Sequence, residues 1–107
     1  MDSFSIKRGD TAPAIRRSFS TAAGPLEIPA DASVVFSMAE AVTGRLVVDR
    51  QRCRIEKDNT VVYFWQDEDT AVAGLYEAEF EITYADGSVE TAPNGGFIVV
   101  NITRDIR

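Results

Sequence analysis

The stretch that decides the fold is residues 76–84, Tyr-Glu-Ala-Glu-Phe-Glu-Ile-Thr-Tyr. Its even positions are apolar or aromatic and its odd positions are polar, a period of two that predicts a half-buried β-strand. A helix would mix the two classes more on each face, and the aromatic and β-branched content also favours a strand. The pair Asp86-Gly87 follows, and it predicts a hairpin with a type I′ turn and a return strand over residues 88–91.

The rest of the chain contains further short extended runs, separated by turn residues. The stronger runs are 33–38, 60–65 and 96–102, and the weaker candidates are 4–7, 15–20 and 45–55. Run 60–65 is apolar on both faces, which indicates a central strand, and the alternation of run 45–55 slips near Val47-Val48, which indicates a bulge. Seven or eight short strands without a long helix predict an all-β, immunoglobulin-like antiparallel sandwich, with residues 1–107 as a single domain.

Tyr76 lies where a strand begins after a turn that ends in Gly74. This arrangement is similar to the tyrosine corner of immunoglobulin-type sandwiches, in which the hydroxyl bonds to upstream backbone. The alternative is an ordinary half-buried strand tyrosine. Ala78 occupies the position of the second cysteine of antibody domains, so core packing must replace the disulfide. We therefore expect structural roles for Trp65, Tyr76 and Phe80.

Composition narrows the classes of function. The chain has 107 residues, a formal net charge of −6, no histidine and one cysteine. An acidic protein is a poor match for phosphate backbones, so we expect no nucleic-acid partner. A single cysteine cannot form an internal disulfide, which favours a reducing compartment. The start of the chain shows no signal-peptide pattern, and no apolar run is long enough to cross a membrane, so we expect a soluble protein without a membrane partner.

Few residues carry catalytic or metal-binding chemistry. The lack of histidine removes the commonest general base, metal ligand and partner of a nucleophile. Cys53 lies between Arg52 and Arg54, which could lower the pKa of its thiol, but alternation along a strand also allows a small core residue flanked by outward arginines. The acidic run 67–69 matches no calcium-loop spacing. We expect no enzyme activity, catalytic residue, cofactor, metal site or small-molecule substrate.

Surfaces remain as candidate sites. Two charged rows have a period of two, namely Arg50, Arg52 and Arg54 in the first row and Glu77, Glu79 and Glu81 in the second. If their strands are neighbours in one sheet, the rows form a cross-strand ladder. If they lie on opposite sides, the domain has an acidic and a basic face suited to head-to-tail or ring assembly. Loops 9–13 and 93–96, with Asp10 and Asn94, complete the candidate interface.

Several motifs in order resemble the N-terminal domain of phage baseplate upper proteins and related prophage tail proteins. They are Ile-Lys-Arg-Gly-Asp-Thr-Ala-Pro at 6–13, Val-Val-Tyr-Phe-Trp at 61–65, Gly-Leu-Tyr-Glu-Ala-Glu-Phe at 74–80, the Asp-Gly turn at 86–87 and Pro-Asn-Gly at 93–95. The resemblance implies an immunoglobulin-like virion component, assembled in the host bacterial cytoplasm, which docks as a repeated copy onto other virion or tail proteins. Members of the family usually continue into a long C-terminal part, whereas this sequence stops after its last strand.

The first functional hypothesis is therefore a phage or prophage structural protein of the baseplate, tail or neck, which acts by protein–protein contacts in a multi-subunit assembly and forms a homo-oligomer. The alternative is a carbohydrate-binding or adhesion module with an aromatic platform built from Tyr63, Phe64 and Trp65. Adjacent strand positions point to opposite faces, so these three side chains cannot all be exposed together. We expect Tyr63 and Trp65 to lie in the core.

Overall fold

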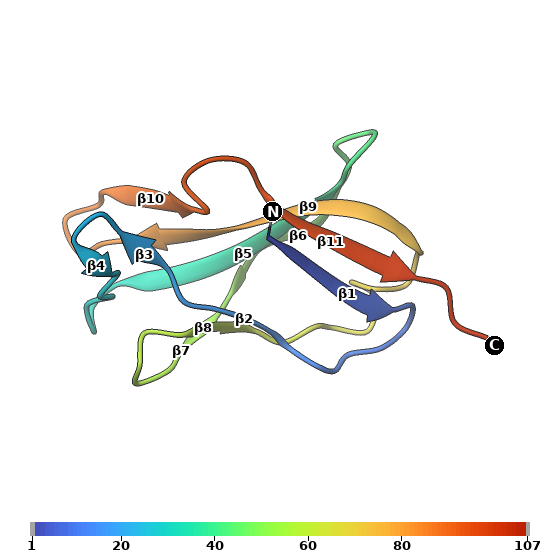
Figure 1. Cartoon of the computed structure of the whole chain (residues 1–107), viewed down its shortest axis with the longest axis horizontal. Helices are drawn as coiled ribbons and strands as arrows, with labels where there is room; N and C mark the ends of the chain where they lie inside the picture. The colour runs from blue at the N-terminus through green and yellow to red at the C-terminus, as the bar shows by residue number, and fades with distance from the viewer. Residues whose placement is uncertain (1, 107) are drawn as a thin grey trace.

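The computed structural model describes residues 2–106, which form two packed β-sheets and a short hairpin (Figure 1). The strands are β1 (Ser3–Lys7), β2 (Ile15–Arg17), β3 (Ser20–Thr21), β4 (Gly24–Pro25), β5 (Ser33–Glu40), β6 (Leu46–Arg52), β7 (Arg54–Ile55), β8 (Val61–Tyr63), β9 (Gly74–Thr83), β10 (Val89–Ala92) and β11 (Ile98–Thr103). The predicted all-β, immunoglobulin-like sandwich is confirmed. Within residues 2–106 the structure contains no helix that could span a membrane.

The larger sheet has six strands in the order β1-β11-β9-β5-β6, with β10 also paired to β9. The smaller sheet has the order β2-β8-β7, so β8 is central as its two apolar faces predicted. β1 runs parallel to β11, and the other pairs are antiparallel. Figure 1 shows the larger sheet above the smaller one, with the core between them.

β9 confirms the predicted alternation, because its apolar side chains are buried and its glutamates face outward. Register places Phe80 opposite Phe36 on β5. The Phe36 ring stacks on Tyr63 at 4.5 Å between centroids and meets Trp65 edge-on at 5.6 Å. Aromatic pairs of this kind contribute about 0.5–1.5 kcal/mol beyond the area they bury. The cluster joins the two sheets, because Phe36 and Phe80 belong to the larger sheet and Tyr63 belongs to the smaller one.

Side-chain hydrogen bonds fasten the loops at one end of the sandwich. The Tyr76 hydroxyl donates to the Val72 carbonyl at 2.6 Å, which is the geometry of a tyrosine corner. Thr70 is fully buried, and its hydroxyl donates to the Asp10 carbonyl at 2.8 Å. These bonds connect the start of β9 to the loop that follows β1.

The predicted type I′ turn after β9 is wrong. Within the described chain the non-glycine residues with positive φ are Arg50 and Asn59, so Asp86 lacks the conformation that such a turn needs. Gly87 alone in the turn has positive φ, at +87°, and its N–H bonds to the Tyr84 carbonyl. A turn followed by a left-handed glycine makes a longer hairpin loop, so the return strand starts at Val89.

The predicted arginine row is also wrong. The run 45–55 divides into β6 in the larger sheet and β7 in the smaller one, with the change at Cys53. The register with β5 shifts twice along β6, once between Leu46 and Val48 and once between Val48 and Gln51, where Arg50 has a φ of +49°. The bulge predicted near Val47-Val48 is therefore confirmed, and a second irregularity follows it. Because of the bulge and the change of sheet, the three arginines do not share one face.

Candidate binding groove

The outer face of the larger sheet carries the predicted glutamate row. Figure 1 shows the β10–β11 loop arching over this sheet and the β5–β6 turn rising beside it. Between these two segments the small residues Ser37 and Ala39 of β5 lie in register with Glu79 and Glu77 of β9. The face is therefore hollowed by small side chains in its middle and bordered by raised chain.

Two hollows on this face share the lining residues Glu77 and Phe97, and we call the two hollows together the Phe97 groove. The larger hollow, of about 440 Å³, is lined by Asp2, Glu77, Pro93, Gly95, Gly96, Phe97 and Val99. The smaller hollow, of about 190 Å³, is lined by Ser37, Met38, Ala39, Leu46, Glu77, Glu79 and Phe97.

Local backbone geometry turns the two large apolar side chains of the groove outward. Gly96 has a φ of +72° and precedes Phe97, which alternates with the buried Ile98. Glu40 shapes the turn before Leu46. The Glu40 carboxyl accepts hydrogen bonds from the Val42 backbone N–H and from the Thr43 hydroxyl. These two bonds, the Val42 bond more than the Thr43 bond, lower the pKa of the carboxyl below its ordinary value.

The groove combines unpaired carboxylates with exposed apolar surface. Asp2 forms an ion pair with Arg17 at 2.8 Å, but the carboxylates of Glu77 and Glu79 have no hydrogen bond or ion pair to any residue in the range 2–106. Phe97 is 48% exposed and Leu46 is 52% exposed. A ligand that offers positive charge beside an apolar group would satisfy both features.

The two charged rows do not pair with each other. Glu81, Val35 and Arg52 lie in one register line across β9, β5 and β6, so one strand separates acid from base. No ion pair joins the rows among the described residues. The predictions of a ladder between neighbouring strands and of opposite acidic and basic faces are both incorrect for these rows. Arg54 instead lies over the Phe64 ring, 4.9 Å from its centroid, and near Glu56.

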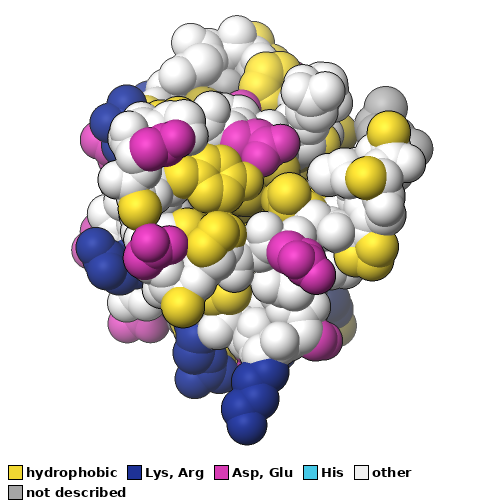
Figure 2. Space-filling model, turned by 90° about the vertical axis from the view of Figure 1, so that its left-hand side faces the viewer, with side chains coloured by type: hydrophobic (Ala, Val, Ile, Leu, Met, Phe, Trp, Pro, Cys, Tyr) yellow, Lys and Arg dark blue, Asp and Glu magenta, His cyan; other side chains and the backbone are white. Residues whose placement is uncertain are grey.

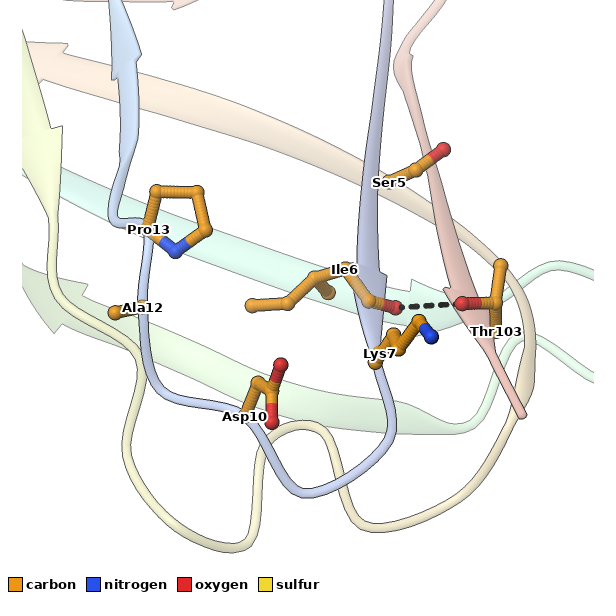
Figure 3. A pocket seen from close by; sticks show the side chains of 7 residues that line it. All are labelled: Ser5, Ile6, Lys7, Asp10, Ala12, Pro13 and Thr103. Carbon is orange, nitrogen blue, oxygen red and sulfur yellow. Dashed lines mark hydrogen bonds between the residues drawn. The ribbon is translucent and has the colours of Figure 1, made fainter. Parts of the chain in front are cut away.

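Asp10 lies in a separate hollow of about 400 Å³ beside β1, lined by Ser5, Ile6, Lys7, Asp10, Ala12, Pro13 and Thr103. Figure 3 shows the Asp10 carboxylate and the Ile6 side chain directed into the space between β1 and the segment that carries Pro13. The fold therefore does not bring Asp10 to the glutamate row.

Asn94 lines a third site, a hollow of about 180 Å³ between the β3–β4 hairpin and β10, together with Phe19, Ser20, Thr21, Leu26, Glu90, Thr91, Ala92 and Pro93. Figure 2 views the molecule from the end that carries β3, β4 and β10 in Figure 1. Hydrophobic side chains gather there with acidic side chains around them, while lysine and arginine side chains gather below. Asn94 is thus close in sequence to the Phe97 groove but lies in a different hollow.

Cys53 is the small, partly buried residue that one of the two interpretations expected. Its side chain packs against the core, and burial raises the pKa of its thiol to about 12. The flanking arginines therefore do not activate it.

In the acidic run 67–69, the Asp69 carboxylate accepts hydrogen bonds from the Tyr63 hydroxyl and, at 2.8 Å, from the Gln66 N–H. Residues 2–106 hold no group of three metal-ligating side chains.

Sequence reasoning missed Phe97 and Leu46. A signal for Phe97 was present, because Ile98, Val100 and Ile102 form the inward row of the last strand and Phe97 has the opposite parity. Tyr63 and Trp65 are in the core as predicted, and Phe64 is exposed beneath Arg54. The three aromatics therefore form no open platform for sugar.

Comparisons with known proteins bear on the fold. No family model matches the chain, and no curated protein matches it. The crystal structure of CopC from Methylosinus trichosporium OB3b is similar to it, with a TM-score of 0.58 and 17% sequence identity, over 100% of this chain and 89% of that chain. At this identity the likeness shows a shared β-sandwich fold.

This comparison contradicts the predicted phage or prophage structural function. CopC shares the fold over the whole chain, and no family model or curated protein supports a baseplate, tail or neck role. The motifs that suggested the role include residues that build the sandwich itself: Trp65 and Tyr76 are buried, and the Asp10 carbonyl accepts a hydrogen bond from the buried Thr70 hydroxyl. Such residues are needed for the fold, whatever the protein binds.

Proposed function

We propose that this protein is a binding module, which holds a basic and partly apolar segment of a protein partner in the Phe97 groove. The observation that carries the proposal is the pair of unpartnered carboxylates, Glu77 and Glu79, beside the exposed ring of Phe97. Alternate residues of a strand are about 7 Å apart, so the two carboxylates can receive two cationic side chains of one extended segment.

The expected energetics favour a specific contact of modest affinity. Phe97 is 48% exposed, so covering its ring would bury roughly 100 Å² of apolar surface, worth about 2.5 kcal/mol. Ion pairs at Glu77 and Glu79 would contribute mainly to selectivity and would weaken as salt increases, because the groove is open to solvent.

Titration with peptides tests the proposal. The protein, labelled with ¹⁵N, is titrated with a nine-residue peptide whose odd positions carry lysine or leucine and whose even positions carry serine, so that both residue types face one side of an extended chain. The matching peptide has serine in place of each lysine. We expect the lysine peptide to shift the amide resonances of groove residues and the serine peptide to bind about tenfold more weakly.

Variants identify the site. Exchange of both Glu77 and Glu79 for glutamine should reduce binding of the lysine peptide, and the Phe97→Ala variant should reduce binding of both peptides. The control is Glu81→Gln, which changes the same row outside the groove. Equal affinities for the groove variants and the control would refute the proposed site.

A further inference from the structure

The segment that follows β11 is complementary to the Phe97 groove, because it carries basic and apolar side chains and the groove carries carboxylates beside apolar surface. Its sequence, residues 104–107, is Arg-Asp-Ile-Arg. Ile106 is 99% exposed, so its own chain covers almost none of it, and Arg104 is also exposed. Figure 1 shows the chain running away from both sheets after β11. The segment thus presents a basic side chain and an apolar side chain at alternate positions.

Spacing matches as well as charge. Arg104 and Ile106 are two residues apart, so an extended backbone directs them to the same side. Glu77 and Glu79 are likewise two residues apart on β9, and Phe97 and Leu46 supply apolar surface beside them. Ile106 can therefore rest against these two side chains while Arg104 meets a carboxylate. Asp105 does not oppose this contact, because it already forms an ion pair with Arg8 at 2.8 Å.

The segment cannot fill the groove of its own chain. Three residues after Thr103 reach at most about 11 Å. Val99, the groove residue on β11, lies four residues back along the strand, which is about 13 Å. The ion pair between Asp105 and Arg8 also holds the segment near the end of β1, two strands away from β9. A segment 104–106 that binds in the groove therefore comes from another molecule.

We infer that the Phe97 groove of one copy binds residues 104–106 of a second copy, head to tail. The inference rests on the proposed function of the groove and names its partner as this same chain. Groove and segment are different surfaces, so the contact is heterologous and leaves a free groove at one end and a free segment at the other. Association should therefore continue into larger species as concentration rises.

Complementation between two defective variants tests the inference by sedimentation velocity at low salt. The Ile106→Asp variant keeps the groove and loses the segment, and the double variant Glu77→Lys with Glu79→Lys keeps the segment and loses the groove. We expect the average mass of the wild-type protein to rise with concentration. Each variant should stay monomeric over the same concentration range, because its association is weakened at least about tenfold. An equimolar mixture of the two variants should form a one-to-one dimer and nothing larger.

Two results would overturn the inference: a wild-type protein that stays monomeric up to millimolar concentration, or variants that associate alone as the wild type does. Circular dichroism of each variant checks that the fold is retained. A peptide of residues 103–107 separates this inference from the proposed function. If the lysine–leucine peptide shifts the groove amides and the 103–107 peptide does not, only the partner is wrong. If neither peptide shifts them, both proposals fail.

Discussion

Exchange of Tyr76 for phenylalanine removes one hydroxyl from a side chain that is only 2% exposed and leaves its ring in place. In the native protein this hydroxyl donates to the Val72 carbonyl at 2.6 Å. A hydrogen bond of this kind contributes about 0.5–1.5 kcal/mol, and a buried acceptor left without a donor costs about 1–3 kcal/mol. Val72 is 59% exposed, so water can partly replace the lost donor. We expect the free energy of unfolding to fall by about 1–2 kcal/mol.

Urea unfolding followed by the fluorescence of Trp65, the single tryptophan, measures this change. With a urea dependence of about 2 kcal/mol per molar, the midpoint should fall by roughly 0.5–1 M. The matched control is Tyr84→Phe, because the Tyr84 hydroxyl donates at 2.7 Å to Glu90, an exposed side chain. That variant should lose less than about 0.5 kcal/mol. Equal midpoints for the two variants would refute the assignment of Tyr76 as a tyrosine corner.

Two further predictions concern the hairpin and the thiol. Gly87→Ala should lower the free energy of unfolding by about 1 kcal/mol, because Gly87 has a φ of +87°, whereas Gly95→Ala, at a position without positive φ, should change it little in the same urea assay. Burial raises the pKa of Cys53 to about 12, so at pH 8 the native thiol should react with a disulfide reagent much more slowly than the urea-unfolded chain. Above pH 9 the unfolded chain loses the thiol proton first, so native stability should fall with rising pH, and this fall should be smaller in a Cys53→Ala variant.

The strand pattern was predictable because it is a local property. Side chains alternate across an extended backbone, so the parity of Tyr76 and Phe80 was enough to assign them inward and the glutamates between them outward. The position of the hairpin after β9 was predicted correctly, but the type of its turn was not. The pair Asp86-Gly87 is compatible with several turns, and the backbone conformation of Asp86 decides among them.

The candidate site was predictable only in part. Glu77 and Glu79 were selected from their period of two, but the chain alone does not tell which neighbours stand beside them. Leu46 lies at the groove because β6 forms the edge of the larger sheet next to β5. Phe97 lies there because the β10–β11 loop crosses above β9. Those placements depend on pairings between residues that are far apart in sequence.

The sequence by itself determined the class of fold, the inward row of each long strand and the lack of histidine, because periodicity and composition do not depend on how strands are arranged. Only the tertiary structure decided that the arginines after Val48 separate at a bulge and a change of sheet, and that Glu77, Glu79 and Phe97 share one groove. A strand's period specifies two faces, but sheet order and register specify what lies beside each face, and these follow from packing of the whole core.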